Sequence, residues 1–226
     1  LGDVYKRQSL LSYSPEDPNF IYSENIEIKN KVAAAGMLFR KDKLSNENSK
    51  VTTLLEKAGT INLGHLNMHE AALGSTNDNP LHGRTYNPHK FSYTPGGSSG
   101  GSGAAVASGF CLFSLGTDTL GSVRIPAAYC GVSGIKPTKG LVSLGGVIPL
   151  CSEFDTVGPL ARSARDLSII YLAIFNSLKK SIKFGYVLSL WTRKPVSTGD
   201  FTPFISNSCV FVCPPKYVFD SKIDTS

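Results

Sequence analysis

The sequence predicts a globular protein of the α/β or α+β class. Of its 226 residues, 41% are hydrophobic and 18% are charged, which is enough apolar material for a core. This balance argues against disorder, collagen and coiled coil, each of which needs a more biased composition. Segments with helical spacing also alternate with short apolar segments typical of buried strands.

Two segments carry the signals of amphipathic helices. Residues 51–58 place apolar side chains at helical spacing, and Gly59 follows where a C-terminal cap belongs. Ser163 and Asp166 form a capping box before a second apolar stripe. The two stripes consist of Val51, Leu54, Leu55 and Ala58, and of Leu167, Ile170, Tyr171 and Ile174.

Short apolar segments predict strands at residues 60–64, 111–116 and 131–135. Between the first two lies an irregular stretch, residues 67–90, rich in Asn, Pro, Gly and His, which a compact domain keeps only for a reason. Beyond residue 179, segments 184–191 and 208–213 are further strand candidates, but prolines interrupt that region.

The distribution of charge argues against a nucleic-acid partner, and the length of the apolar runs argues against a membrane span. The net charge is +6, but the basic residues are scattered and form no stripe suited to a phosphate backbone, so no nucleic acid is expected. The longest apolar runs, residues 104–115 and 167–175, fall short of the roughly 20 residues of a membrane helix.

The five cysteines are odd in number and lie mainly in apolar surroundings, so most are expected to be buried, reduced thiols. The one close pair, Cys209 and Cys213, has no His or second Cys pair nearby, which argues against a zinc site. His65 and His69 have the spacing of a metal pair on a helix, but the surrounding sequence turns from strand into loop, which favours satisfied or solvated histidines.

The chain begins with Leu1 and shows neither the basic nor the apolar region of a signal peptide, which suggests a cytoplasmic or organellar protein. Residues 1–8 fit nothing downstream and are interpreted as a scar outside the fold. The chain is therefore expected to be a fragment.

Residues 94–103 read TPGGSSGGSG and precede a small, apolar segment, a pattern that predicts a glycine-rich loop opening a buried helix. Residues 96–100 also fit the G-x-S-x-G nucleophile elbow, but every histidine precedes Ser98, against the order of that enzyme class. The segment lacks the Gly-Lys-Ser/Thr ending of a Walker loop. A flexible linker is the remaining simple alternative.

A second segment, residues 116–127, reads GTDTLGSVRIPA. Together with GGSSGGS it closely resembles the amidase signature family, and the flanking sequence supports this over residues 33–176, more weakly back to Ile26. The resemblance implies an α/β fold with a twisted mixed sheet surrounded by helices, of which residues 9–178 form the N-terminal part. Residues 179–226 remain unassigned, as a divergent or incorrect-frame tail.

The resemblance implies a catalytic triad in which Ser122 is the nucleophile and Ser98, entered by a cis peptide bond, is the bridging serine. The family lysine lies in an apolar strand ending Lys-Asp, and residues 26–30 (IEIKN) match best, which points to Lys29. Asn30 replaces the usual acid, and Lys31 and Lys41 are rivals.

A lysine base must be buried to work at neutral pH. Its free pKa of about 10.4 would leave it protonated, so burial has to lower that pKa by roughly three units, or about 4 kcal/mol. The amine would then accept the Ser122 proton through the Ser98 hydroxyl. The sequence therefore predicts a neutral amine inside the fold.

The expected oxyanion donors are the main-chain N–H groups of the loop that ends at the nucleophile. They belong to Thr119, Leu120, Gly121 and Ser122. Leu120 stands where the family usually has Gly, which would cause strain if the turn requires a positive φ. Support for the loops is expected from Asp118, Arg124, Gly97 and Ser99.

The resulting hypothesis is an amidohydrolase that cleaves a linear, small-molecule carboxamide through an acyl-enzyme, with no metal or cofactor. The alternative is a noncatalytic or inactive amidase-like fragment or scaffold. A lesser alternative is the glutaminase subunit of a tRNA-dependent amidotransferase, which typically has Gln in place of Ile125. The resemblance also allows a homodimer of the full-length protein.

Overall fold

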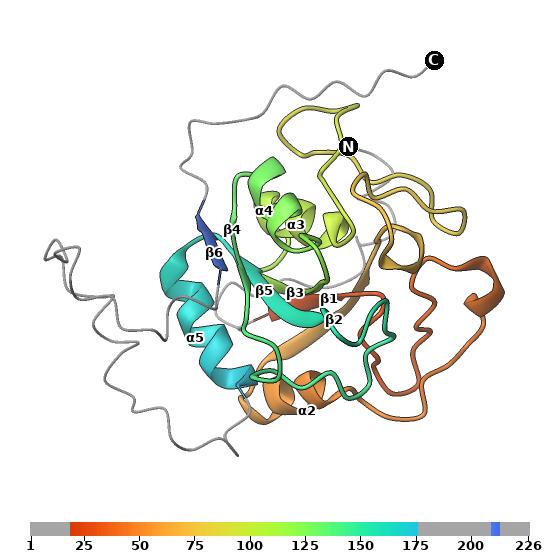
Figure 1. The fold of residues 1–226 in the computed structure, drawn as a ribbon, viewed down its shortest axis with the longest axis vertical. Helices are drawn as coiled ribbons and strands as arrows, with labels where there is room; N and C mark the ends of the chain where they lie inside the picture. The colour runs from red at the N-terminus through yellow and green to blue at the C-terminus, as the bar shows by residue number, and fades with distance from the viewer. Residues whose placement is uncertain (1–18, 176–208, 213–226) are drawn as a thin grey trace, which may run out of the picture.

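The computed structural model describes residues 19–175 and 209–212. These residues form a six-stranded mixed sheet with helices on both faces, which confirms the α/β class (Figure 1). The strands are β1 (Asn19–Ser23), β2 (Ile61–Leu66), β3 (Phe113–Asp118), β4 (Ser133–Lys136), β5 (Thr156–Ala161) and β6 (Cys209–Val212). The helices are α2 (Lys50–Lys57), α3 (Gly100–Ala107), α4 (Arg124–Tyr129) and α5 (Ala164–Ile174), with 3-10 turns η1 (Leu38–Arg40) and η2 (Glu70–Ala72).

The strand order is β2-β1-β3-β5-β4-β6. Strand β1 pairs in parallel with both β2 and β3, whereas the pairs β3–β5, β5–β4 and β4–β6 are antiparallel. The C-terminal ends of β1, β2 and β3 therefore lie along one edge of the sheet, where loops that follow parallel strands commonly carry a binding site.

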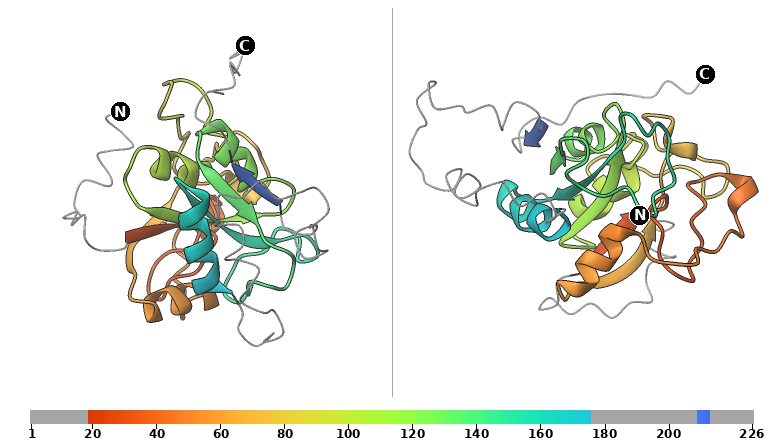
Figure 2. Two further views of the ribbon diagram at one scale, coloured as in Figure 1. Left: turned by 90° about the vertical axis from the view of Figure 1, so that its left-hand side faces the viewer. Right: turned by 60° about the horizontal axis from the view of Figure 1, so that its bottom comes forward.

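Apolar side chains alternate between the two faces of the sheet. On one face, Tyr22 and Leu115 pack against Leu55 of α2 and Ile170 of α5. On the other face, a second cluster joins the sheet to α3 and α4. It includes Leu66, Ala104, Val123, Ala127 and Leu160. The same two layers can be followed in the side views of Figure 2.

Most predicted elements are present at the expected places. Ser49 caps α2, accepting a hydrogen bond from the Thr52 N–H, and Gly59 follows with φ +81°. The Ser163 side chain accepts from the Asp166 N–H, so the predicted helix start is confirmed. Strand β6 lies within the candidate segment 208–213, whereas segments 1–8 and 184–191 lie outside the described residues.

The first strand is not where the sequence pattern predicts it. Residues 26–30 are expected as the strand that carries the base, but β1 spans Asn19–Ser23, and Ile26 and Lys29 form only isolated bridges. Ile26 and Ile28 are buried at alternate positions, so an extended apolar pattern is real there. It belongs to a segment that follows the strand, and periodicity alone could not distinguish the two.

The irregular stretch at residues 67–90 braces the N-terminus of α3. The Gly100 N–H donates to Asn77 Oδ1 at 2.8 Å, and the Asn87 amide donates to the Tyr129 carbonyl at 2.8 Å. The first of these bonds satisfies a helix N–H that has no partner within its own helix. Asparagine side chains thus hold α3 and the C-terminal end of α4 in place.

Cys111 and Cys130 are buried free thiols, and Cys151 is partly buried. Burial raises the pKa of Cys111 to about 12, so its thiol stays protonated. Across the described residues, the structure has no helix with the length and apolar character needed to cross a bilayer.

Candidate active site

The two sequence motifs meet at the C-terminal end of β3. The Ser99 N–H donates to the Ser122 carbonyl at 3.1 Å, and Ser99 Oγ is 3.1 Å from the Thr117 nitrogen. Strand β3 has Gly116 beneath this contact, and a Cβ there would lie 2.6 Å from Ser99 Oγ. The glycine therefore lets the glycine-rich loop pack directly on the strand that leads to Ser122.

Ser98 lies at the centre of this junction. The peptide bond between Gly97 and Ser98 is cis, as the family resemblance implied. The side chain of Ser98 is fully buried, and its Oγ atom has no hydrogen-bond partner among the described residues. A Cβ on Gly97 would lie 2.7 Å from the Gly74 carbonyl oxygen, so this position also needs a glycine. Ser122 is partly exposed, which leaves its hydroxyl within reach of a ligand.

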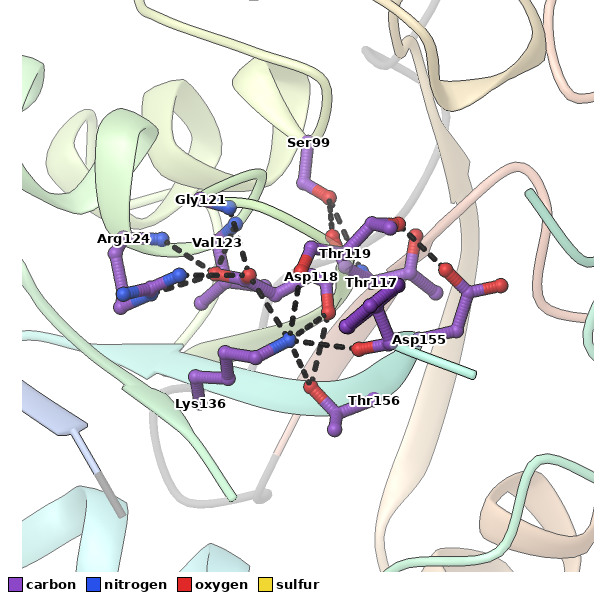
Figure 3. Close-up of polar contacts among 11 residues, drawn as sticks. Ser99, Thr117, Asp118, Thr119, Gly121, Val123, Arg124, Lys136, Asp155 and Thr156 are labelled. Carbon is purple, nitrogen blue, oxygen red and sulfur yellow. Dashed lines mark hydrogen bonds and ion pairs between the residues drawn. The ribbon is translucent and has the colours of Figure 1, made fainter. Parts of the chain in front are cut away.

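The loop from Asp118 to Arg124 is held by the carboxylate of Asp118 (Figure 3). Its Oδ1 accepts from the Gly121 N–H at 2.8 Å and its Oδ2 from the Val123 N–H at 3.1 Å. Arg124 Nε donates to Oδ2 at 3.0 Å, so the expected contact between Asp118 and Arg124 is present. Both oxygens of this buried carboxylate are used to shape the loop.

Charge around Asp118 keeps it ionised. Burial by itself raises the pKa of Asp118, but the hydrogen bonds and charge of Arg124, followed by the charge of Lys136, outweigh burial and hold the pKa below its usual 3.8. The side chain is fully buried, whereas that of Arg124 is 29% exposed. The loop is thus built around a desolvated anion with two cationic neighbours.

Lys136, at the end of β4, is a site residue that sequence reasoning missed. Its ammonium reaches the carbonyl oxygens of Asp118, Thr119 and Phe154. Figure 3 shows the Lys136 side chain directed toward Asp118 and Thr119, although β4 is separated from β3 by β5 in the sheet. The sequence places this lysine at the end of an apolar strand but contains no local signal for these long-range partners.

The oxyanion prediction needs one correction. The Gly121 N–H is engaged by Asp118, because the carboxylate lies inside the turn, so Gly121 is not an open donor. Within the described residues, no hydrogen bond is found for the N–H groups of Leu120 and Ser122.

Leu120 does not carry the strain considered above. Gly121 has φ +141°, whereas Leu120 is not among the non-glycine residues with positive φ. The Leu120 side chain is 82% exposed and lies outside the turn. The left-handed geometry falls on the following residue, where glycine is retained.

Lys29 is not brought to the two serines, so the expectation of a buried base at this position is wrong. Its side chain is exposed, and its backbone bridges Ser45 beyond the end of β1. The buried neighbours Ile26 and Ile28 take the inward positions of this extended segment and turn Lys29 outward. Lys31 and Lys41, the rivals, are exposed as well.

The residue beneath the glycine-rich loop at the end of β1 is Ser23. Ser23 pairs with Leu66 of β2, and Leu66 packs on the α3 side of the sheet. On the other side of β1, Tyr22 pairs with Leu115 of β3, so the next residue, Ser23, lies beside Gly116. Ser23 is fully buried, and its hydroxyl lies 3.6 Å from Met68 Sδ. A neutral side chain with a weak acceptor therefore occupies the end of β1, beside Gly116.

The histidines have structural partners. His65 Nε2 lies 2.7 Å from the Ile26 carbonyl oxygen, and burial lowers the pKa of His65 below 6.5 despite that hydrogen bond. His69 Nδ1 lies 3.3 Å from the Asp78 nitrogen. Among the described residues, no group of three or more His, Cys, Asp and Glu side chains is arranged to hold a metal ion.

Comparison with known proteins gives consistent matches. The family model described as Amidase matches residues 23–193. A glutamyl-tRNA(Gln) amidotransferase subunit of Exiguobacterium sibiricum is 46% identical over 151 residues, which cover 67% of this chain and 32% of that protein. The corresponding subunit of Bacillus cytotoxicus is 44% identical over 167 residues, covering 70% of this chain and 34% of that protein.

Solved structures agree with these matches. A glutamyl-tRNA(Gln) amidotransferase subunit from Thermotoga maritima has a TM-score of 0.69 at 34% identity, covering 74% of this chain and 38% of that one. A peptide amidase in complex with the competitive inhibitor chymostatin has a TM-score of 0.67 at 35% identity, covering 76% of this chain and 36% of that one. The chain thus spans about a third of the length of the relatives it matches.

Proposed function

The chain belongs to the amidase family, and from that premise we propose that its site cleaves a carboxamide C–N bond with Ser122 as nucleophile and Ser98 as proton relay. The observation that supports this most directly is the hydrogen bond from the Ser99 N–H to the Ser122 carbonyl, 3.1 Å long, because it joins the loops of both serines. A buried hydroxyl without a partner among the described residues at Ser98 also fits a relay.

In the proposed reaction, Ser122 Oγ attacks the amide carbonyl carbon while its proton moves to Ser98 and from there to a base. The relay then returns a proton to the nitrogen, the C–N bond breaks, and ammonia or an amine leaves an acyl-enzyme. Water attacks the ester carbonyl and loses a proton to the same relay. The bond between the carbonyl carbon and Ser122 Oγ then breaks, Ser122 takes a proton back from Ser98, and the carboxylate is released. No step requires a redox partner.

The mechanism needs a neutral amine beside Ser98, and exposed Lys29 does not meet that need. This favours a second candidate function, a noncatalytic amidase-like module that binds amides but turns them over slowly or not at all. General base catalysis contributes about 10²- to 10⁴-fold, so a site without its base would retain only a small fraction of full activity.

The names of the relatives bear on the substrate. Identities of 44–46% with glutamyl-tRNA(Gln) amidotransferase subunits strengthen the amidotransferase alternative relative to a general amide hydrolase. The side chain of Ile125 lies against Gly96 and Gly121, so this position borders both loops and is suited to influence substrate choice. A small-molecule carboxamide, such as a primary amide, is the common chemistry of both options.

A fluorophosphonate probe tests the proposal on the chain as it exists. We expect covalent labelling that maps to Ser122 by peptide mass spectrometry and disappears in Ser122→Ala. A comparison of the rate of ammonia release from glutamine with the rate from a peptide amide would then distinguish the two substrate classes. If folded protein is not labelled yet retains a carboxamide ligand in equilibrium dialysis, the noncatalytic module is the better description.

A further inference from the structure

Lys136 joins three main-chain carbonyl groups that belong to two different loops. Its Nζ lies 3.0 Å from the Thr119 oxygen and 2.8 Å from the Phe154 oxygen, and it also contacts the Asp118 oxygen. An ammonium group has three N–H donors and no lone pair. The Asp118 carboxylate oxygen Oδ1 at 3.3 Å and Thr156 Oγ1 at 3.5 Å also lie within reach of Nζ, so its acceptors outnumber its three hydrogens and Lys136 is not arranged to act as a base for Ser98.

The same contacts fix the direction of two main-chain N–H groups. In a trans peptide, the carbonyl of one residue and the N–H of the next lie in one plane and point in opposite directions. Of the described peptide bonds, only Gly97–Ser98 is cis. Holding the Asp118 and Thr119 carbonyls at Lys136 therefore turns the N–H groups of Thr119 and Leu120 away from it, toward the opposite side of the loop.

We propose that Lys136 is a positioning residue that aims the Thr119 and Leu120 N–H groups at the oxyanion formed on Ser122, an inference that rests on the proposed function. The positive charge contributes as well, since a cation on a carbonyl oxygen polarises the peptide and strengthens its N–H as a donor. Hydrogen-bond donors fixed before the reaction lower its barrier because they need no reorganisation.

Neighbouring contacts support this role over that of a simple surface lysine. The Thr119 side chain donates to Asp155 Oδ1, whose partner oxygen Oδ2 accepts from the Leu150 N–H at 2.9 Å. The loop before β5 is therefore tied to Thr119 both through Asp155 and through Lys136. The Gly121 N–H donates to the Asp118 carboxylate and is not available to a ligand. Thr119 and Leu120 therefore carry the N–H groups whose direction depends on Lys136.

Lys136→Met tests the proposal, with Lys139→Met as the matched control. Lys139 lies on the same segment but pairs with Glu153 at 3.1 Å, where the two side chains are 50% and 76% exposed. The probe is phenylboronic acid, which forms a tetrahedral adduct with a serine oxygen and so mimics the oxyanion. We expect Lys136→Met to raise its Kd about tenfold or more. Lys139→Met should leave it within about twofold.

A second ligand separates positioning from general loosening. Benzamide, a neutral amide, should bind Lys136→Met and the wild type equally, because only the oxyanion mimic depends on the aimed donors. Equal boronate affinity in a folded Lys136→Met protein would overturn the inference while leaving the proposed function intact. If Ser122→Ala binds the boronate as tightly as the wild type, the proposed function fails and the inference with it.

Lys136→Arg keeps the test decisive if the methionine variant does not fold. A guanidinium is planar and presents its donors as a fork, so it does not converge on three carbonyls as an ammonium does. We expect a loss of boronate affinity smaller than that of Lys136→Met, together with an unchanged circular dichroism spectrum. Wild-type affinity in this variant would contradict the proposal.

Discussion

Strands β1 and β3 are adjacent and parallel, and they end at the same edge of the sheet, yet their ends differ in chemistry. The end of β3 carries a buried carboxylate flanked by Arg124 and Lys136, which together shape a loop of N–H donors. The end of β1 carries Ser23, a buried hydroxyl whose contact is a thioether sulfur. The half of the site that would stabilise negative charge is braced by many contacts, whereas the half that would supply a base holds a neutral side chain.

This contrast teaches that the parts of such a site depend on different kinds of structure. Donor loops are built by short motifs whose residues contact one another, and these are intact here. A base depends on one side chain at one register position of a separate strand. A chain can therefore retain the first and lack the second.

The variant with the largest expected effect is Ser23→Lys, which adds an amine to the end of β1. Because a buried lysine loses its charge readily, the amine is expected to be neutral and to accept a proton from Ser98. We expect the rate of fluorophosphonate labelling at Ser122 to rise about 10²- to 10⁴-fold, measured at pH 8 by gel fluorescence.

Ser23→Met is the control for that experiment, since it adds length without an amine. Its labelling rate should equal that of the wild type. An equal gain in both variants would show that packing rather than base strength had changed. No gain in a folded Ser23→Lys protein would show that an amine at the end of β1 cannot accept a proton from Ser98.

Asp118→Ala removes the anion that organises the other half of the comparison. It leaves buried N–H groups and Arg124 without their acceptor, so we expect a loss of about 3 kcal/mol or more in the free energy of unfolding. Urea denaturation measures this loss. Asp78→Asn breaks the more exposed pair with Arg84 and should cost no more than about 1 kcal/mol. Similar losses in the two variants would remove the distinction between a buried organiser and a surface pair.

His65, which contacts the Ile26 carbonyl in the segment after β1, makes the stability of the folded protein depend on pH. Because its pKa is lowered in the folded protein, the unfolded chain binds the proton more readily, and stability falls as the pH drops below 6.5. His65→Gln retains a donor for the Ile26 carbonyl but does not titrate, so its melting temperature should fall less between pH 7 and pH 5. Identical slopes in His65→Gln and the wild type would exclude His65 as the source.

Lys29→Met has the smallest expected effect. Its side chain is exposed, so labelling at Ser122 should remain within about twofold and the free energy of unfolding within about 0.5 kcal/mol. The measurement is the same labelling assay beside a urea titration. A loss of labelling above tenfold would restore Lys29 as the base and remove the contrast between the two strand ends.

Local signals in the sequence were sufficient for much of this molecule. The cap at Ser163 and Gly59 at the end of α2 are local features, and the glycine-rich opening of α3 and the apolar segments of β2 and β3 are visible in the sequence pattern. The contact between the two loops, seen in the hydrogen bond from the Ser99 N–H to the Ser122 carbonyl, was implied by two motifs that together resemble a known family. For these features, the sequence carries both the residues and their spacing.

Only the tertiary structure decided which side chain occupies the end of β1 and which cation supports the loop after β3. Residues 26–30 and β1 are both extended and apolar, so their pattern does not reveal which one enters the sheet; pairing with β2 and β3 selects Asn19–Ser23. Lys136 reaches the Asp118 and Thr119 carbonyls from another strand. Sequence determines what is local because neighbouring residues constrain one another, whereas register and cross-strand contacts arise from the packing of the whole sheet.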